Sequence, residues 1–257
     1  NHDRGIELPI FVHLARGGVQ LVPQDGSAVH TGLDAVVYST AVERSNPDFR
    51  AAEDLGVTLV RRGSFLASIA AARRAVAVAG TSGKSTVTAM IAHHFERAGL
   101  EPSFLGGGAA VDVRGAIPPG SLRLGASDWF VVETDESDGS VAEFAPSVSV
   151  LTNLSRDHKE VEETAKNFGR LLAQTRDAVV LHVGDPPLQT VALPPRLRVI
   201  RVAVEGHPVW AEPELTARHV ALTPTGVSFD VEGFRALVPF PGKLTVENAL
   251  HAIAAGV

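Results

Sequence analysis

Residues 75–86 read AVAVAGTSGKST, an apolar run that meets a glycine-rich turn ending in lysine, serine and threonine. The continuous apolar stretch at 75–79 predicts a strand that is buried on both faces, as in a parallel sheet. Residues 85–99 place apolar side chains along one stripe and stop at Gly99, which predicts an amphipathic helix. A buried strand, a tight turn and a helix in this order are typical of α/β proteins, so this stretch decides the fold class.

Strand and helix patterns alternate on both sides of this stretch. The predicted strands are 18–23, 34–40, 57–62, 128–134, 147–153, 177–183 and 196–204, and the predicted helices are 46–56, 64–74, 159–175 and 244–256. Residues 213–240 alternate in polarity around a Pro-Thr-Gly turn, which predicts antiparallel hairpins. We therefore predict an α/β protein: a small Rossmann-like unit over 1–72, then a P-loop-type central domain over 73–257. The central domain should combine a mostly parallel sheet with a small antiparallel sheet.

Composition excludes several classes of function. The formal net charge is -6 and no Lys/Arg-rich run stands out, so the electrostatic basis for binding long nucleic acid is missing. The absence of cysteine excludes disulfides, thiolate metal sites and a cysteine nucleophile. The sequence shows no signal peptide and no apolar run long enough to span a bilayer. We expect a cytoplasmic protein that acts on small molecules and does not bind membranes.

The turn matches a shortened phosphate-binding loop. The full pattern G-x-x-x-x-G-K-[ST] has a further glycine where this chain has Val78. Glycines let backbone amides approach phosphate oxygens, and the N-terminus of the following helix favours negative charge. A plain strand–turn–helix is the alternative, but a lysine followed by hydroxyl side chains favours phosphate binding. The predicted loop comprises Gly80, Thr81, Ser82, Gly83, Lys84, Ser85 and Thr86.

Two later strands end in groups that suit a metal ion. The segment WFVVETDESDGS (129–140) supplies Glu133, Asp135, Glu136 and Asp138, and LTNLSRDHKE (151–160) supplies Asn153, Asp157 and His158. In α/β proteins ligands bind outside the carboxyl ends of parallel strands, so we expect these groups to gather beside the loop. A solvated acidic turn and a structural histidine are the alternatives. Together with Lys84 and Ser85 the set indicates Mg-nucleotide binding and phosphoryl transfer.

Four motifs in order resemble the Mur ligases: GTSGKST, ETDESDGS, LTNLSRDH and FPGKLTVENALHAIAAG. ETDESD and the early STAVERSNPDF are most similar to the alanine-adding branch. The resemblance implies an ATP-dependent, ADP-forming ligase of peptidoglycan precursor synthesis, with ATP and Mg²⁺ as cofactors. Its small-molecule substrates would be UDP-N-acetylmuramate, whose carboxylate is activated as an acyl phosphate, and L-alanine, whose amine then attacks.

The resemblance also implies roles for single residues. Lys84 would hold the ATP phosphates, Ser85 and Glu133 would bind magnesium, and His158 would bind a second ion next to the substrate carboxylate. Lys84, Glu133 and His158 are thus the predicted catalytic set. The further predicted contacts are Asn153 and Asn248 with the nucleotide, Ser39 and Thr40 with the UDP portion, and Gly106 and Gly107 with the sugar nucleotide.

The chain departs from the family pattern at three places. Ser82 stands where the alanine-adding enzymes usually carry histidine, which is a mild change. The pair Leu244–Thr245 stands where the family commonly has His-Asn, which changes the expected adenine contacts. The family's glycine-rich opening and its third domain lie outside the given residues, so we expect 1–72 to be a partial UDP-binding-like domain and the isolated chain to turn over poorly. Three alternatives stay open: a recycling ligase that adds a preformed peptide, a nucleotide-binding fragment without catalysis, and a kinase with Asp157 as base.

Overall fold

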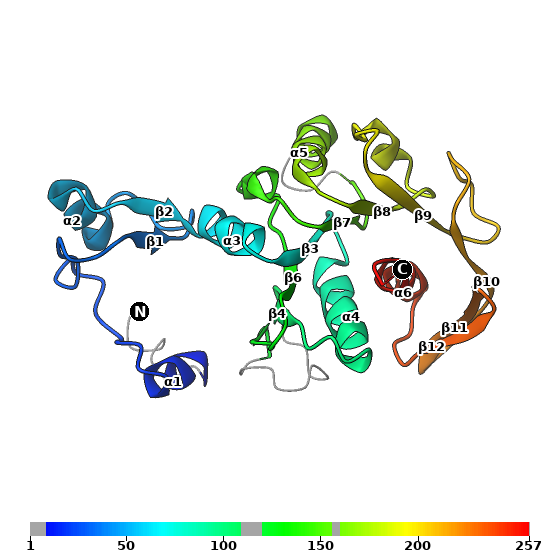
Figure 1. Cartoon of the computed structure of the whole chain (residues 1–257), viewed down its shortest axis with the longest axis horizontal. Helices are drawn as coiled ribbons and strands as arrows, with labels where there is room; N and C mark the ends of the chain where they lie inside the picture. The colour runs from blue at the N-terminus through cyan, green and yellow to red at the C-terminus, as the bar shows by residue number, and fades with distance from the viewer. Residues whose placement is uncertain (1–8, 109–119, 156–159, 257) are drawn as a thin grey trace.

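The computed structural model describes residues 9–108, 120–155 and 160–256 (Figure 1). Its helices are α1 (Pro9–Arg16), α2 (Pro47–Leu55), α3 (Arg62–Ala71), α4 (Lys84–Arg97), α5 (Val161–Gln174) and α6 (Lys243–Ala254), with 3-10 turns η2 (Ser140–Glu143) and η3 (Pro186–Thr190). Its strands are β1 (Val36–Tyr38), β2 (Leu59–Arg61), β3 (Arg74–Ala79), β4 (Ser103–Leu105), β5 (Leu122–Arg123), β6 (Trp129–Glu133), β7 (Val148–Leu151), β8 (Ala178–His182), β9 (Arg198–Val204), β10 (Leu215–Thr223), β11 (Gly226–Val231) and β12 (Phe234–Val238).

Two sheets organise the chain. The larger has ten strands in the order β12-β11-β10-β9-β8-β7-β3-β6-β4-β5, and the smaller pairs β1 with β2 in parallel. From β10 to β4 every neighbouring pair is parallel, while β5, β11 and β12 are antiparallel to their neighbours. The predicted mixed α/β class is confirmed. The predicted hairpins also form, and β10 joins them to the parallel sheet by pairing with β9.

Strand β3 lies inside the sheet between β7 and β6, and its side chains pack against helices on both faces. Its valines, Val76 and Val78, belong to the core shared with α4 and α6. Its alanines at 75, 77 and 79 belong to the core shared with α3 and α5. Successive side chains of a strand point to opposite faces, so a run of apolar residues buries both. Figure 1 shows α4 and α6 on one side of the sheet and α5 on the other.

The N-terminal part confirms the predicted helix 46–56 nearly to the residue. Asn46 caps α2, accepting a hydrogen bond from the Asp48 amide at 2.9 Å, and Pro47 is the first helical residue. Gly56 ends the helix in the left-handed conformation with φ 68°. Each of these signals is local, which is why the sequence predicts this helix so closely.

The predicted strand at 18–23 is wrong. These residues form no regular element, and all six are exposed in the structure. Val19, Leu21 and Val22 are among the exposed large apolar side chains. A short strand needs a neighbouring strand for its backbone hydrogen bonds, and the two-stranded sheet of the N-terminal part pairs only β1 with β2.

Helix α1 and strands β4 and β5 were not predicted from the sequence. Strands β4 and β5 are three and two residues long, too short to show a period.

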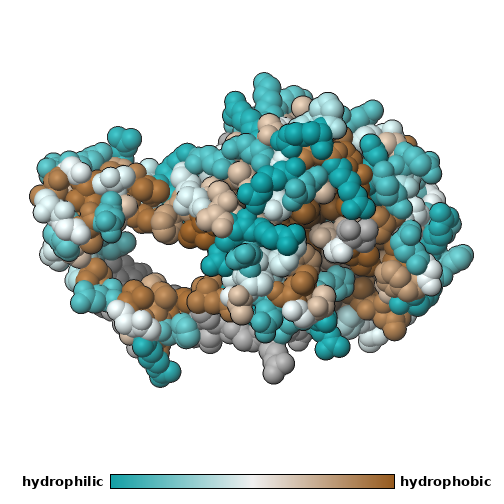
Figure 2. All heavy atoms as spheres, viewed as in Figure 1, coloured by the Kyte–Doolittle hydropathy of each residue, from teal (hydrophilic) through white to brown (hydrophobic). Residues whose placement is uncertain are grey.

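Figure 2 shows brown, hydrophobic residues over the N-terminal part, in keeping with the exposed Val37 and Leu55 there. In the part of the chain that the structure describes, no helix combines the length and the apolar character needed to cross a membrane.

Candidate functional site

The glycine-rich loop lies between the end of β3 and the start of α4. Gly80 has φ 142° and Gly83 has φ 81°, both in the range that favours glycine. A Cβ atom built on Gly80 would lie 2.0 Å from Thr152 Oγ1, and one built on Gly83 would lie 2.6 Å from Asn248 Oδ1. The loop thus lies between the end of β7 and helix α6. A larger residue at Gly80 would overlap Thr152 and the Asn153 backbone, and one at Gly83 would be strained by its φ and would displace the Asn248 side chain.

The segment after β7 holds the loop in place. Asn153 Oδ1 accepts a hydrogen bond from the Ser82 amide at 2.9 Å, and Asn153 Nδ2 donates to the Ser82 carbonyl at 3.0 Å. Thr81 and Ser155 are linked in the same way, since the Ser155 amide donates to Thr81 Oγ1 at 2.9 Å. These bonds fix the loop before any ligand arrives, which lowers the ordering cost of binding.

The first turn of α4 is open toward a ligand. Among the described residues, no side chain caps the N-terminus of this helix. The amides of a first helical turn lack intrahelical partners and carry partial positive charge. Ser85 and Thr86 belong to this turn, so their hydroxyl groups lie where an anion or its metal ion would bind.

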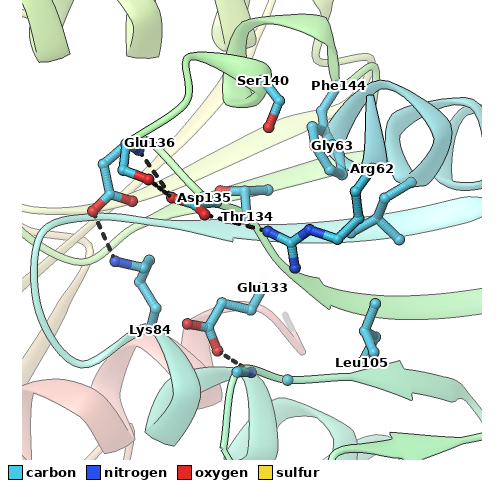
Figure 3. Close-up of a pocket in the computed structure, with 14 residues that line it drawn as sticks. Arg62, Gly63, Lys84, Leu105, Glu133, Thr134, Asp135, Glu136, Ser140 and Phe144 are labelled. Atoms are coloured by element: carbon cyan, nitrogen blue, oxygen red, sulfur yellow. Dashed lines mark hydrogen bonds and ion pairs between the residues drawn. The ribbon is translucent and has the colours of Figure 1, made fainter. Parts of the chain in front are cut away.

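Lys84 and Glu133 line one cavity of about 360 Å³ (Figure 3). Glu133 ends β6, and its Oε2 accepts a hydrogen bond from the Gly107 amide at 2.6 Å. Lys84 Nζ donates to the Gly80 carbonyl at 2.7 Å and to Glu136 Oε1 at 2.9 Å. The full lining comprises Arg62, Gly63, Leu66, Lys84, Leu105, Gly106, Gly107, Glu133, Thr134, Asp135, Glu136, Ser137, Ser140 and Phe144.

The cavity contains three carboxylates and two cationic side chains. Burial raises the pKa of Asp135, but hydrogen bonds from Ser137 and the charges of Arg62 and Lys84 outweigh it and hold that pKa below its ordinary value. Asp135 is therefore ionised at neutral pH, 3.4 Å from an Arg62 nitrogen. Carboxylate oxygens in excess over cations suit a hard divalent ion such as Mg²⁺.

The described residues include no cluster of three His, Asp or Glu side chains able to hold a metal ion alone. Magnesium commonly takes one or two carboxylates and completes its shell with waters and substrate phosphates. Glu133 and the Ser85 hydroxyl fit that partial role, since Glu133 is in the cavity and Ser85 is at the start of α4. The donor set therefore fits magnesium brought in with a nucleotide.

The predicted site residues fall into five groups. The loop residues other than Lys84 form the turn and the start of α4 but do not line the cavity: Gly80, Thr81, Ser82, Gly83, Ser85 and Thr86. Lys84, Glu133, Gly106 and Gly107 line the cavity together. Asn153 and Asn248 contact the loop. Ser39 and Thr40 follow β1 in the smaller sheet and do not line the cavity. His158 and Asp157 lie outside the described residues.

Three charged side chains of the cavity have no role assigned from the sequence: Arg62, Asp135 and Glu136. Asp135 and Glu136 are expected beside the loop, and the structure places both in the cavity. Both acids belong to the ETDESD motif at the end of a strand, but the motif does not indicate which role each of them has. Arg62 begins α3, and no sequence motif indicates that this helix borders the site.

Comparisons with known proteins match these features. A family described as the Mur ligase middle domain matches residues 78–256. UDP-N-acetylmuramate–L-alanine ligases from Symbiobacterium thermophilum and Novosphingobium aromaticivorans are 35% and 33% identical, each over 95% of this chain and 52% of the relative. The chain thus spans about half the length of the curated relatives it matches.

Two solved structures share the fold at 23% identity. The UDP-N-acetylmuramate–alanine ligase MurC from Thermotoga maritima has a TM-score of 0.78, over 95% of this chain and 56% of its own. A murein peptide ligase from Psychrobacter arcticus has a TM-score of 0.81, over 96% of this chain and 57% of its own. These likenesses bear on the fold alone.

Proposed function

The chain belongs to the Mur ligase family, and on that premise we propose that its protein is an ATP-dependent ligase of peptidoglycan precursor synthesis. The reaction joins the carboxylate of UDP-N-acetylmuramate to the amine of L-alanine and releases ADP and phosphate. Curated relatives at 31–35% identity carry the name UDP-N-acetylmuramate–L-alanine ligase, which supports this substrate pair.

One observation carries the proposal: Lys84 and Glu133 line the same cavity beside the open N-terminus of α4. Phosphoryl transfer to a carboxylate brings two anions together, so the protein must supply positive charge where they meet. Lys84 and the first-turn amides of α4 would bind the phosphates of ATP. Bound Mg²⁺, held by Glu133 and the Ser85 hydroxyl, would neutralise further charge on the transferred phosphoryl group.

The residues of the chain act mainly by position. The loop 80–83 is fixed by Asn153, so the phosphates would be placed without reorganisation of the backbone. The γ-phosphoryl group moves to a carboxylate oxygen and ADP leaves. The amine then attacks the carbonyl carbon, phosphate departs and the nitrogen loses a proton. Gly106 and Gly107, next to Glu133, would border the substrate carboxylate.

A recycling ligase is the second candidate. The murein peptide ligase from Psychrobacter arcticus and MurC from Thermotoga maritima share this chain's fold to a similar degree, with TM-scores of 0.81 and 0.78, so the fold does not separate the two reactions. Both reactions would begin at the same acyl phosphate and differ only in the amine. We also propose that 73–257 forms the nucleotide-binding domain and that 1–72, with Ser39 and Thr40, is UDP-binding-like.

A phosphate-release assay tests the function. It uses ATP, Mg²⁺ and UDP-N-acetylmuramate with either L-alanine or a tripeptide, on the 257-residue chain and on any longer product of the same gene. We expect the chain to bind Mg-ATP with slow turnover and the longer product to release phosphate only with L-alanine. Tripeptide-dependent release would identify the recycling ligase. A chain that does not bind Mg-ATP would contradict the proposal.

A further inference from the structure

The ammonium group of Lys84 already has two partners in the cavity. Nζ donates to the Gly80 carbonyl at 2.7 Å and to Glu136 Oε1 at 2.9 Å. The side chains of Lys84 and Glu136 are only 16% and 14% exposed, so water screens the pair weakly. Figure 3 shows the two groups facing each other, Lys84 from α4 and Glu136 from the segment after β6. A phosphate that takes Lys84 as its ion-pair partner therefore competes with Glu136 for the ammonium group.

Stability of the fold does not account for this ion pair. Glu136 Oε2 is buried and has no hydrogen-bond partner among the described residues. A buried ion pair offsets the cost of removing its charges from water only when the remaining lone pairs are also satisfied. Oε2 lacks a hydrogen-bond partner in the described part of the chain, so the protein alone does not recover the full cost of burying this carboxylate. The arrangement instead suits a contact that is made and broken during ligand binding.

We propose that Glu136 is a positioning residue that holds Lys84 over the loop and yields it to the nucleotide phosphates. The inference rests on the proposed function and adds a selection for metal-bound nucleotide. Once Lys84 turns to a phosphate, Glu136 is an unpaired carboxylate beside further negative charge. That repulsion opposes binding of a metal-free nucleotide. Mg²⁺ bound with the phosphates offsets it, so Glu136 favours Mg-ATP over free ATP.

The test measures dissociation constants of ADP and ATP by calorimetry, with Mg²⁺ and with EDTA. Glu136→Gln keeps an oxygen that can accept from Lys84 but removes the negative charge. We expect the variant to bind metal-free nucleotide more tightly, on the order of tenfold for the loss of one partly buried like charge. With Mg²⁺ the gain should be clearly smaller. The readout is the ratio of the dissociation constants measured with EDTA and with Mg²⁺. A purely structural role of Glu136 would leave this ratio unchanged.

Two controls separate this role from a general change of charge. Asp135→Asn removes a charge from the same cavity, but Asp135 forms its ion pair with Arg62, at 3.4 Å, and Lys84 acts on it only through its charge. We expect Asp135→Asn to change the metal-free affinity less than Glu136→Gln does. In a Lys84→Met background, Glu136→Gln should lose part of its effect on metal-free binding, because the competition for the lysine is gone while the repulsion between Glu136 and the phosphates remains. Thermal unfolding checks that each variant is folded.

The outcomes distinguish the two proposals. If the unmodified chain binds no nucleotide, the proposed function fails and this inference fails with it. Suppose that the chain binds Mg-ATP. If Glu136→Gln and Asp135→Asn then raise the affinity for metal-free nucleotide equally, or if Glu136→Gln raises it by the full amount in the Lys84→Met background, only the role of Glu136 is overturned. Weaker metal-free binding by a folded Glu136→Gln variant would also overturn it.

Discussion

Two glycines beside the site differ in what an added methyl group would meet. At Gly80 a Cβ would lie 2.0 Å from Thr152 Oγ1 and 3.1 Å from a backbone nitrogen, at φ 142°. The backbone cannot move away, so Gly80 is required for the loop to form. At Gly107 the nearest atom is Glu133 Oε1 at 2.8 Å, the end of a flexible side chain. Gly107 therefore matters for the position of a carboxylate and not for the fold.

We predict that Gly107→Ala weakens Mg²⁺-dependent nucleotide binding and leaves stability nearly unchanged. The methyl group would displace the Glu133 carboxylate, and loss of support around a metal ligand typically costs on the order of tenfold in metal affinity. Magnesium titrations at fixed ATP would measure the change. Gly108→Ala is the matched control, since its Cβ would come no closer than 3.9 Å to Ser85 Cβ. An equal loss in both variants would contradict the prediction.

The sequence predicts the residues of the site better than it predicts their contacts. Lys84 and Glu133 follow from motifs at the ends of strands, and the structure brings both to one cavity. The pairing of Lys84 with Glu136 joins positions 52 residues apart and depends on how β3 and β6 align in the sheet. Contacts of this kind arise from sheet register, which no local pattern encodes.

At the scale of elements, local signals predict more than long-range pairing does. Helix α2 is predicted by Asn46, Pro47 and Gly56, and each acts on its own neighbours in the chain. The apolar segment 18–23 has a strand-like pattern but no strand. A strand forms only when a neighbouring strand accepts and donates its backbone hydrogen bonds. A strand-like pattern that has no such neighbour in the fold therefore predicts a strand that does not form.

Strand β8 and helix α6 bring two histidines together in the core. His182 and His251 are 5% and 1% exposed, with ring centroids 6.0 Å apart, and Nε2 of each lacks a hydrogen-bond partner among the described residues. Burial, with the charge of His207, lowers the pKa of His182 to about 4. Burial, with the charge of His182, lowers the pKa of His251 to about 4, although the carbonyls of Glu247 and Leu151 oppose the shift.

We predict that the free energy of unfolding falls as pH drops below about 6.5. In that range the unfolded chain binds protons at these histidines and the folded chain does not, until pH approaches the folded pKa of about 4. Between pH 7.5 and 5.5 one such histidine contributes a loss of roughly 1 kcal/mol. Urea unfolding at both pH values would measure it.

A variant assigns this pH dependence to the buried pair. His251→Leu removes one titrating group, so its stability should fall less between the two pH values than that of the unmodified chain. The exposed His93 provides a control, and His93→Gln should keep the full dependence. Equal pH dependence in all three proteins would show that the buried histidines are not responsible.

At the scale of the whole molecule, the cavity lies where two parts of the chain meet. Helix α3 contacts β1 and β2 on one side and η2 on the other, and its Ala67 and Ala70 enter the core of the ten-stranded sheet. A Cβ on Gly63 would lie 2.2 Å from Ser140 Oγ, so this helix approaches η2 closely. Figure 1 shows α3 between the N-terminal part and the larger sheet. The sequence predicts both parts but not that α3 borders the cavity.

Nucleotide should stabilise the two parts unequally, which hydrogen exchange on the intact chain can measure. The small sheet has two strands of three residues and is marginal alone, whereas the loop and its contacts belong to the ten-stranded sheet. At a hundred times the dissociation constant, Mg-ATP should slow exchange of the slowest β3 amides by about a hundredfold, and those of β1 and β2 far less. Lys84→Met at the same ATP concentration is the control and should show little slowing. Uniform slowing in both parts would mean that the chain opens as one cooperative unit, because binding would then stabilise every amide equally.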